Sequence, residues 1–141
     1  MPPRVVLDTQ VVLDWRYFGD RALADWSLPG ASWHWVATAA MREELAHVLR
    51  RGFDARWTTP ADDVLHFFDA HSSPCATAAL APDMARRLAC RDPDDQKFID
   101  LAVALAPSCL VSRDRAVLAL SRRAAALDVR ILPPSRWAPP A

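Results

Sequence analysis

The chain has 141 residues, 52% of them apolar, which is enough for one domain with its own hydrophobic core. Its 17 basic and 17 acidic side chains cancel, so bulk basicity gives no argument for nucleic-acid binding. There is no run of about 18 apolar residues, so no membrane span is expected, and Asp8 and Asp14 interrupt any N-terminal signal segment. Three cysteines without zinc-type spacing argue against a disulfide framework and favour a reducing cytoplasm.

The first half of the chain alternates short apolar runs with helical patterns. The run at residues 4–7 is continuous and ends at Asp8, as in a strand that is buried on both faces of a parallel sheet. Thr38 and Gly52 bracket a run of good helix formers and are its expected caps. We therefore expect strands at 4–7 and 33–37, and helices at 10–18, 20–28 and 39–51.

The second half continues the alternation and ends in a tail in which Trp137 is the only anchor. Strands that alternate with helices predict an α/β fold with a mainly parallel sheet. The chain shows no repeats and no long linker, which predicts a single domain over residues 1–141. We expect helices at 60–71, 83–88, 93–106 and 114–127, strands at 109–112 and 129–132, a short edge strand within 72–81, and a tail at about 133–141.

An acid-rich stretch at residues 91–100 places four aspartates around the start of a predicted helix. Asp92 is the expected N-cap, and Pro93 has the fixed φ of a first helical turn. A helix N-terminus favours negative charge, so a capped helix with a solvated acidic start explains part of the pattern. Capping does not need so many carboxylates, and we expect one of Asp92, Asp94 and Asp95 to face a divalent cation.

Acidic residues also follow the two clearest strands, as Asp8 and Asp114. Ligands of an open parallel sheet bind beyond the carboxyl ends of its strands. Asp95 starts the helix that leads into the second strand, and Glu44 lies about one and a half turns into its helix, so both are expected at the same edge. Such an all-oxygen set prefers magnesium or manganese and suits phosphodiester hydrolysis. Thr9 and Ser112 are expected to add hydroxyl contacts, and Arg113 is expected to add a cation that faces phosphate.

Four short motifs in this order resemble the PIN-domain nucleases, in particular the VapC-like toxins. They are Val5–Thr9, Arg42–Leu49, Asp92–Asp95 with Phe98–Ala104, and Leu110–Asp114. The resemblance runs through nearly the whole chain and implies a three-layer α/β/α domain. It further implies a ribonuclease that depends on Mg²⁺ or Mn²⁺, that is often a homodimer and that is often inhibited by a cognate antitoxin.

The resemblance carries the family's acidic quartet over to Asp8, Glu44, Asp95 and Asp114. One residue departs from the family pattern, because Gln10 stands where the family usually has asparagine. A longer amide there would displace a contact that orients water. Each acid also has a structural alternative, since three of them are possible helix caps and Glu44 follows another surface glutamate.

Two other functions stay open. In an aspartyl-phosphate enzyme, Asp8 would be the nucleophile and Lys97, the only lysine, its cationic partner. A PIN-fold module that binds RNA or protein without chemistry is the other, and Gln10 is the feature that favours it. An RNA groove would need local arginines, for instance Arg42, Arg50, Arg51 and Arg113, while most tryptophans are expected in the core or at a dimer surface.

Overall fold

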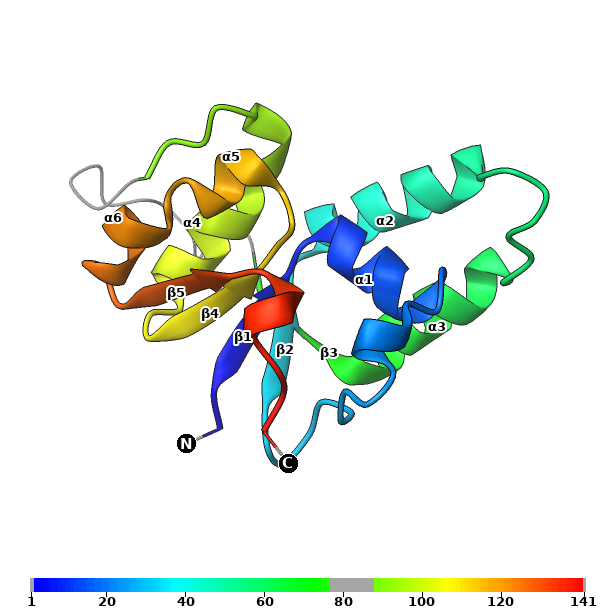
Figure 1. Ribbon diagram of the computed structural model, residues 1–141, viewed down its shortest axis with the longest axis horizontal. Helices are drawn as coiled ribbons and strands as arrows, with labels where there is room; N and C mark the ends of the chain where they lie inside the picture. The colour runs from blue at the N-terminus through cyan, green and yellow to red at the C-terminus, as the bar shows by residue number, and fades with distance from the viewer. Residues whose placement is uncertain (1, 77–87, 141) are drawn as a thin grey trace.

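The computed structural model describes residues 2–76 and 88–140, and its centre is a sheet of five parallel strands in the order β3-β2-β1-β4-β5 (Figure 1). This confirms the predicted α/β fold with a parallel sheet. The strands are β1 (Arg4–Leu7), β2 (His34–Ala37), β3 (Ser72–Pro74), β4 (Ser108–Val111) and β5 (Val129–Leu132).

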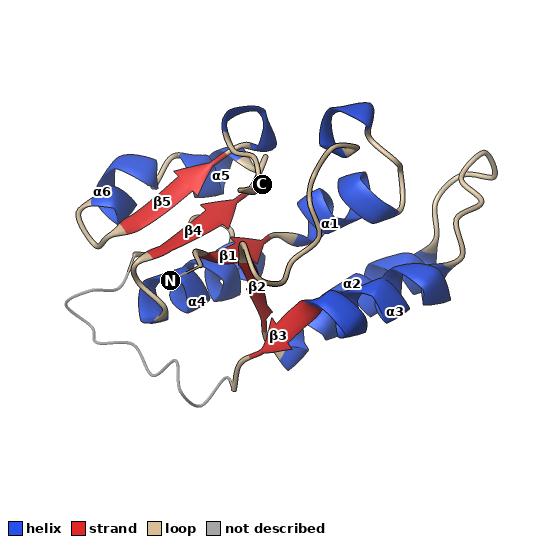
Figure 2. Cartoon of the chain, turned by 90° about the horizontal axis from the view of Figure 1, so that it is seen from below, coloured by secondary structure: helices blue, strands red, loops and turns tan. Residues whose placement is uncertain are grey.

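Helices cover both faces of the sheet and form three layers with it (Figures 1 and 2). The helices that precede β3 in the chain form a first group on one face of the sheet, and the helices that follow β3 form a second group on the other face. Right-handed crossovers between parallel strands require this arrangement. The first group is α1 (Thr9–Arg16), α2 (Ala39–Arg51) and α3 (Ala61–His71); the second is α4 (Gln96–Ala104), α5 (Arg115–Leu118) and α6 (Ser121–Ala125). Short 3₁₀ turns lie at Arg21–Leu23, Pro93–Asp95 and Pro134–Arg136.

The central strand β1 is buried on both faces, which explains its unbroken apolar sequence. Val5 and Val6 have no exposed surface, and Leu7 is 3% exposed. A parallel strand of this kind needs apolar side chains on both of its faces. Only Arg4, at the half-buried start of the strand, is charged, and the strand ends where Asp8 reaches the carboxyl edge of the sheet.

Helix α2 has the predicted bounds and the predicted caps. The Thr38 hydroxyl accepts a hydrogen bond from the Met41 N–H, and Gly52 ends the helix with a φ of +75° that glycine adopts without strain. A bidentate ion pair of Arg42 with Asp69, at 2.6 and 2.8 Å, joins α2 to α3. These two helices form an antiparallel pair beside the sheet (Figure 2).

Most of the tryptophans lie in the hydrophobic core, as expected. The Trp15 ring lies 5.2 Å from both Trp26 and Phe67, in edge-to-face contacts, and Trp33 is fully buried. Trp137 packs against Trp26 and Trp33, so the C-terminal residues do have the predicted anchor. Edge-to-face contacts of this kind add stability beyond the buried area alone.

Two helix predictions were wrong in extent. The predicted helix at 114–127 is divided into α5 and α6, because a tight turn at Leu120, whose N–H bonds to the Val117 carbonyl at 3.0 Å, redirects the chain over β5. The segment at 20–28 forms only a 3₁₀ turn, since Trp26 is drawn into the core and Pro29 stops any continuation.

The other local predictions have mixed outcomes. The edge strand expected within 72–81 is the short strand β3, and the helix expected at 83–88 lies almost entirely outside the described residues. In the part of the chain that the structure describes, no helix is long and apolar enough to cross a membrane.

We expect Trp33→Ala to lower the free energy of unfolding by about 3–5 kcal/mol, because it leaves a large cavity and removes the indole N–H bond to the Ser27 carbonyl. Urea denaturation measures this difference. The matched variant Trp57→Ala, whose ring is only half-buried, should lose less. Equal losses in the two variants would contradict the assignment of Trp33 to the core.

Candidate active site

The central strand pair β1–β4 places two polar residues side by side at the carboxyl edge of the sheet. Leu7 pairs with Val111, and the Asp8 N–H bonds to the Val111 carbonyl at 3.2 Å. Ser112, the residue directly after β4, is fully buried and donates a hydrogen bond from its hydroxyl to Asp8 Oδ2. The chain leaves β1 toward β2 and leaves β4 toward β5, so this edge is a topological switch point, where such sheets bind ligands.

A cavity of about 480 Å³ opens at this edge and is lined by all four predicted acids, Asp8, Glu44, Asp95 and Asp114. They come from four separate segments: the end of β1, helix α2, the turn before α4 and the loop after β4. Asp92 and Asp94 are exposed and do not line the cavity, so Asp95 is the member of the acidic stretch that faces it.

Asp8 is 5% exposed and combines two contacts. Its Oδ1 caps α1 by accepting a hydrogen bond from the Val11 N–H at 2.9 Å, and its Oδ2 accepts from Ser112. Burial raises its pKa from 3.8 to about 6, and the negative charges of Asp114 and Asp14 act in the same direction. The capping alternative is therefore correct for Asp8, but capping uses only one of its two oxygens.

Asp114 also caps a helix. Its Oδ1 accepts from the N–H groups of Ala116 and Val117 at 2.8 and 3.2 Å, and its own N–H donates to the Ser112 hydroxyl at 3.0 Å. Ser112 therefore contacts both strand-end aspartates. It links the Asp8 carboxylate to the backbone of Asp114 in the middle of the sheet edge.

Asp95 is half-buried, and its pKa is raised from 3.8 to about 6. Burial is the largest cause, followed by the charges of Asp114, Asp92, Asp8 and Glu44. This mutual repulsion is the electrostatic signature of carboxylates that share one cavity, and a cation would relieve it.

Glu44, which lines the same cavity, is held by two donors. The Lys97 ammonium lies 2.9 Å from Glu44 Oε1 and also bonds to the Asp94 carbonyl at 2.5 Å, while the Thr9 hydroxyl donates to Glu44 Oε2. Lys97 was predicted only as a partner of Asp8, so this ion pair is a new finding of the structure. A signal was present, because the only lysine of the chain stands within the acidic stretch.

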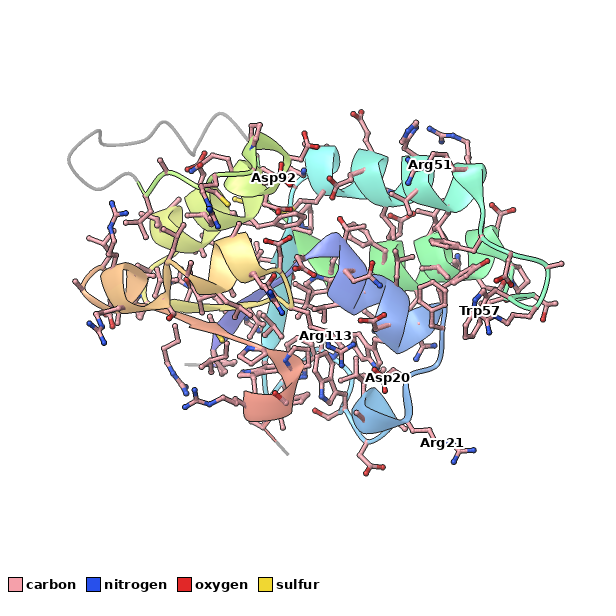
Figure 3. All side chains as sticks on the ribbon, turned by 45° about the horizontal axis from the view of Figure 1, so that its top comes forward. Asp20, Arg21, Arg51, Trp57, Asp92 and Arg113 are labelled. Atoms are coloured by element: carbon pink, nitrogen blue, oxygen red, sulfur yellow. The ribbon has the colours of Figure 1, made fainter. Side chains whose placement is uncertain are left out.

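Arg113, which Figure 3 labels together with Asp20, lines the cavity, but its guanidinium is engaged by two carboxylates. Its Nη1 lies 2.5 Å from Asp14 Oδ2, and its Nη2 lies 3.1 Å from Asp20 Oδ2. Gln10 also lines the cavity and donates its amide to Asp14 Oδ1 at 2.9 Å. Asp14 was not singled out in the sequence, although a charged residue beside Trp15 on the apolar face of a predicted helix was a usable signal.

The donor set fits a hard divalent cation, because it consists of carboxylate and hydroxyl oxygens. Within residues 2–76 and 88–140, no three histidine, cysteine or acidic side chains converge on a single coordination point. The hydrogen bonds explain this geometry. Asp8, Glu44 and Asp114 each turn oxygens toward donors of the protein itself.

The sequence matches the family model of the PIN domain over residues 4–116, and the chain belongs to the PIN-domain family. The matched residues include every acid of the cavity and end before β5, which pairs along the whole of β4. No curated protein matches the chain. PIN domains have a nuclease-type fold, so the match also indicates a nuclease.

We expect the metal-free protein to lose stability as the pH rises from about 4 to about 6, as far as Asp8 and Asp95 contribute. Both pKa values are raised in the folded state, so the folded chain binds more protons in this window and ionisation favours unfolding. Asp8→Asn removes this cost and should raise the free energy of unfolding at pH ~7.5 by at most about 3 kcal/mol, with no gain below pH ~4.

Urea denaturation in EDTA at several pH values measures this effect. The matched control is Asp128→Asn, an exposed residue before β5 with φ +65°, a conformation that asparagine also tolerates. An Asp8→Asn protein that is less stable than the wild type at every pH would refute the electrostatic interpretation.

Proposed function

We propose that this protein is an endoribonuclease that depends on Mg²⁺ or Mn²⁺. The observation that supports the proposal best is the meeting of Asp8, Glu44, Asp95 and Asp114 in one cavity at the switch point of a PIN-domain sheet. Carboxylates from four segments would not gather there for capping alone, because burial, together with their mutual repulsion, raises the pKa of two of them.

In the proposed site, Asp8, Asp95 and Asp114 hold the cation, and Glu44 binds it directly or through water. A bound cation of this kind lowers the pKa of water and offsets the charge that builds up on a phosphodiester during cleavage. The two hydroxyl groups act on the carboxylates rather than on substrate: Ser112 orients Asp8, and Thr9 orients Glu44. Such supporting contacts strengthen metal binding in general.

The finer parts of the proposal rest on the resemblance to VapC-like toxins. We expect RNA as the substrate, a homodimer, and inhibition by a cognate antitoxin protein. We also expect the protein to act in the cytoplasm, which suits its three cysteines, all of them free. Gel filtration tests the dimer, and co-purification with the product of a neighbouring gene tests the antitoxin.

The two alternative functions are less well supported. Lys97 bonds to Glu44 and to the Asp94 carbonyl, not to Asp8, so it does not assist Asp8 as a phosphate acceptor. The alternative of a module that binds RNA or protein without catalysis rests on Gln10, which stands where the family usually has asparagine. The Gln10 amide is bonded to Asp14 while its side chain still lines the cavity.

We expect Asp8→Asn and Asp114→Asn each to reduce RNA cleavage by at least about 100-fold, because each removes one negative charge from the cation site while asparagine keeps the helix cap. Calorimetric titration with Mn²⁺, after treatment with EDTA, should show binding to the wild type and to the control Asp128→Asn, and weaker or no binding to the two site variants. Undiminished cleavage by purified Asp8→Asn protein would refute the proposed cation-dependent mechanism.

We expect Lys97→Gln to tighten Mn²⁺ binding about two- to ten-fold. The ammonium neutralises Glu44 and competes with the cation, and this ion pair is only about a quarter exposed on each side. Arg130→Gln, which removes a positive charge from an exposed position of β5, is the matched control and should leave the affinity unchanged. Weaker Mn²⁺ binding by Lys97→Gln would instead show that Lys97 holds Glu44 in its ligating position.

A further inference from the structure

The outer part of the acidic cavity has a different chemistry from its floor. Glu44, Val48 and Arg51 all line it, and their spacing of four and three residues places them in one stripe along α2. The stripe changes from acidic to apolar to basic over about 10 Å. Directly after it, Gly52 reverses the chain with its positive φ and presents Phe53 to the same cavity.

Phe53 is an exposed aromatic ring with a fixed orientation. It is 40% exposed and, with Leu28, is one of the two large apolar side chains found on the surface of the described residues. Its ring lies 5.1 Å from Tyr17 and 4.9 Å from Phe18, with interplanar angles of 44° and 76°. These contacts hold one side of the ring, while the exposed part faces the cavity.

Arg51 supplies a positive charge that the protein does not use internally. Arg51 and Arg113 are the two arginines that line the cavity, and Arg113 is paired with Asp14 and Asp20. Among the described residues, no carboxylate lies within ion-pair distance of Arg51. Figure 3 shows Arg51 on α2, on the same side of the molecule as Trp57 in the connection to α3.

We propose that Phe53 and Arg51 form a binding site for one unpaired nucleotide of RNA, next to the acidic residues. The base stacks on the exposed part of the Phe53 ring, and the guanidinium of Arg51 pairs with the adjoining phosphate. Its position beside a cleavage site rests on the proposed function. A fixed aromatic ring can stack with a base only when that base is free, so the site selects single-stranded RNA over duplex.

The test measures the binding of a fluorescein-labelled single-stranded RNA of about ten nucleotides by anisotropy, in EDTA so that no cleavage occurs. Phe53→Leu keeps an apolar side chain but removes the stacking surface, and should weaken binding at least about five-fold at every salt concentration. Phe53→Tyr should restore it. Arg51→Gln should weaken binding and also lower the slope of log affinity against log salt by about 0.7.

The controls separate stacking from general apolar or structural effects. Leu28→Ala changes the other exposed large apolar residue, which does not line the cavity, and should bind RNA like the wild type. Duplex RNA of the same sequence should bind more weakly than the single strand and should not respond to Phe53→Leu. Mn²⁺ titration of Phe53→Leu should match the wild type, because Phe53 is not a proposed ligand.

Single-stranded RNA binding that is equal in the wild type and in Phe53→Leu overturns the inference, whether or not the wild type binds Mn²⁺ and cleaves RNA. Loss of a dimer in Phe53→Leu with unchanged RNA binding also overturns it, since the ring would then belong to a protein interface. The proposed function fails separately, if the wild type neither binds Mn²⁺ nor cleaves RNA. In that case a Phe53-dependent affinity in EDTA still supports the nucleotide site.

Discussion

The pairing of β1 with β4 is the constraint on which the rest of the site depends. These strands are distant in sequence, and their register brings Asp8 next to Ser112 at the middle of the sheet edge. A shift of one residue would turn the buried valines of β1 to the opposite faces and move Asp8 away from Ser112. Because both strands are buried on both faces, the apolar core itself holds this register and so sets the geometry of the acids.

The sequence predicted those features that depend on local chemistry. The caps of α2, the bounds of β1 and the position of Asp8 directly after it all follow from residues close together in the chain, and the structure confirms them. The second central strand, β4, begins and ends one residue earlier than predicted. Of Asp92, Asp94 and Asp95, only Asp95 lines the cavity, and its role toward a metal stays a prediction. The turn at Leu120 was missed because it arises from packing on β5, which the local pattern of good helix formers does not report.

Contacts between distant segments could not be predicted from local sequence patterns. The pairs of Lys97 with Glu44 and of Arg113 with Asp14 and Asp20 join segments 53 or more residues apart. The position of Lys97 within the acidic stretch indicates that it lies near carboxylates, but the sequence does not tell which distant acid Lys97 or Arg113 meets. For that reason Arg113 was interpreted as a cation that faces phosphate, whereas the folded chain uses its guanidinium to join the end of β4 to α1 and the loop that follows. Its role toward substrate stays a prediction.

Asp8 and Asp114 each follow one of the two central strands, and the carboxylate of each residue also caps the helix that comes next. This shared use affects how substitutions at the site can be interpreted. An alanine at either position would remove a helix cap together with a charge, so a loss of activity would mix misfolding with lost chemistry. Asparagine keeps the cap and removes only the charge. Alanine scanning, the usual first survey of an unknown site, would therefore overstate the catalytic importance of these two residues relative to Glu44 and Asp95, neither of which caps a helix through its side chain.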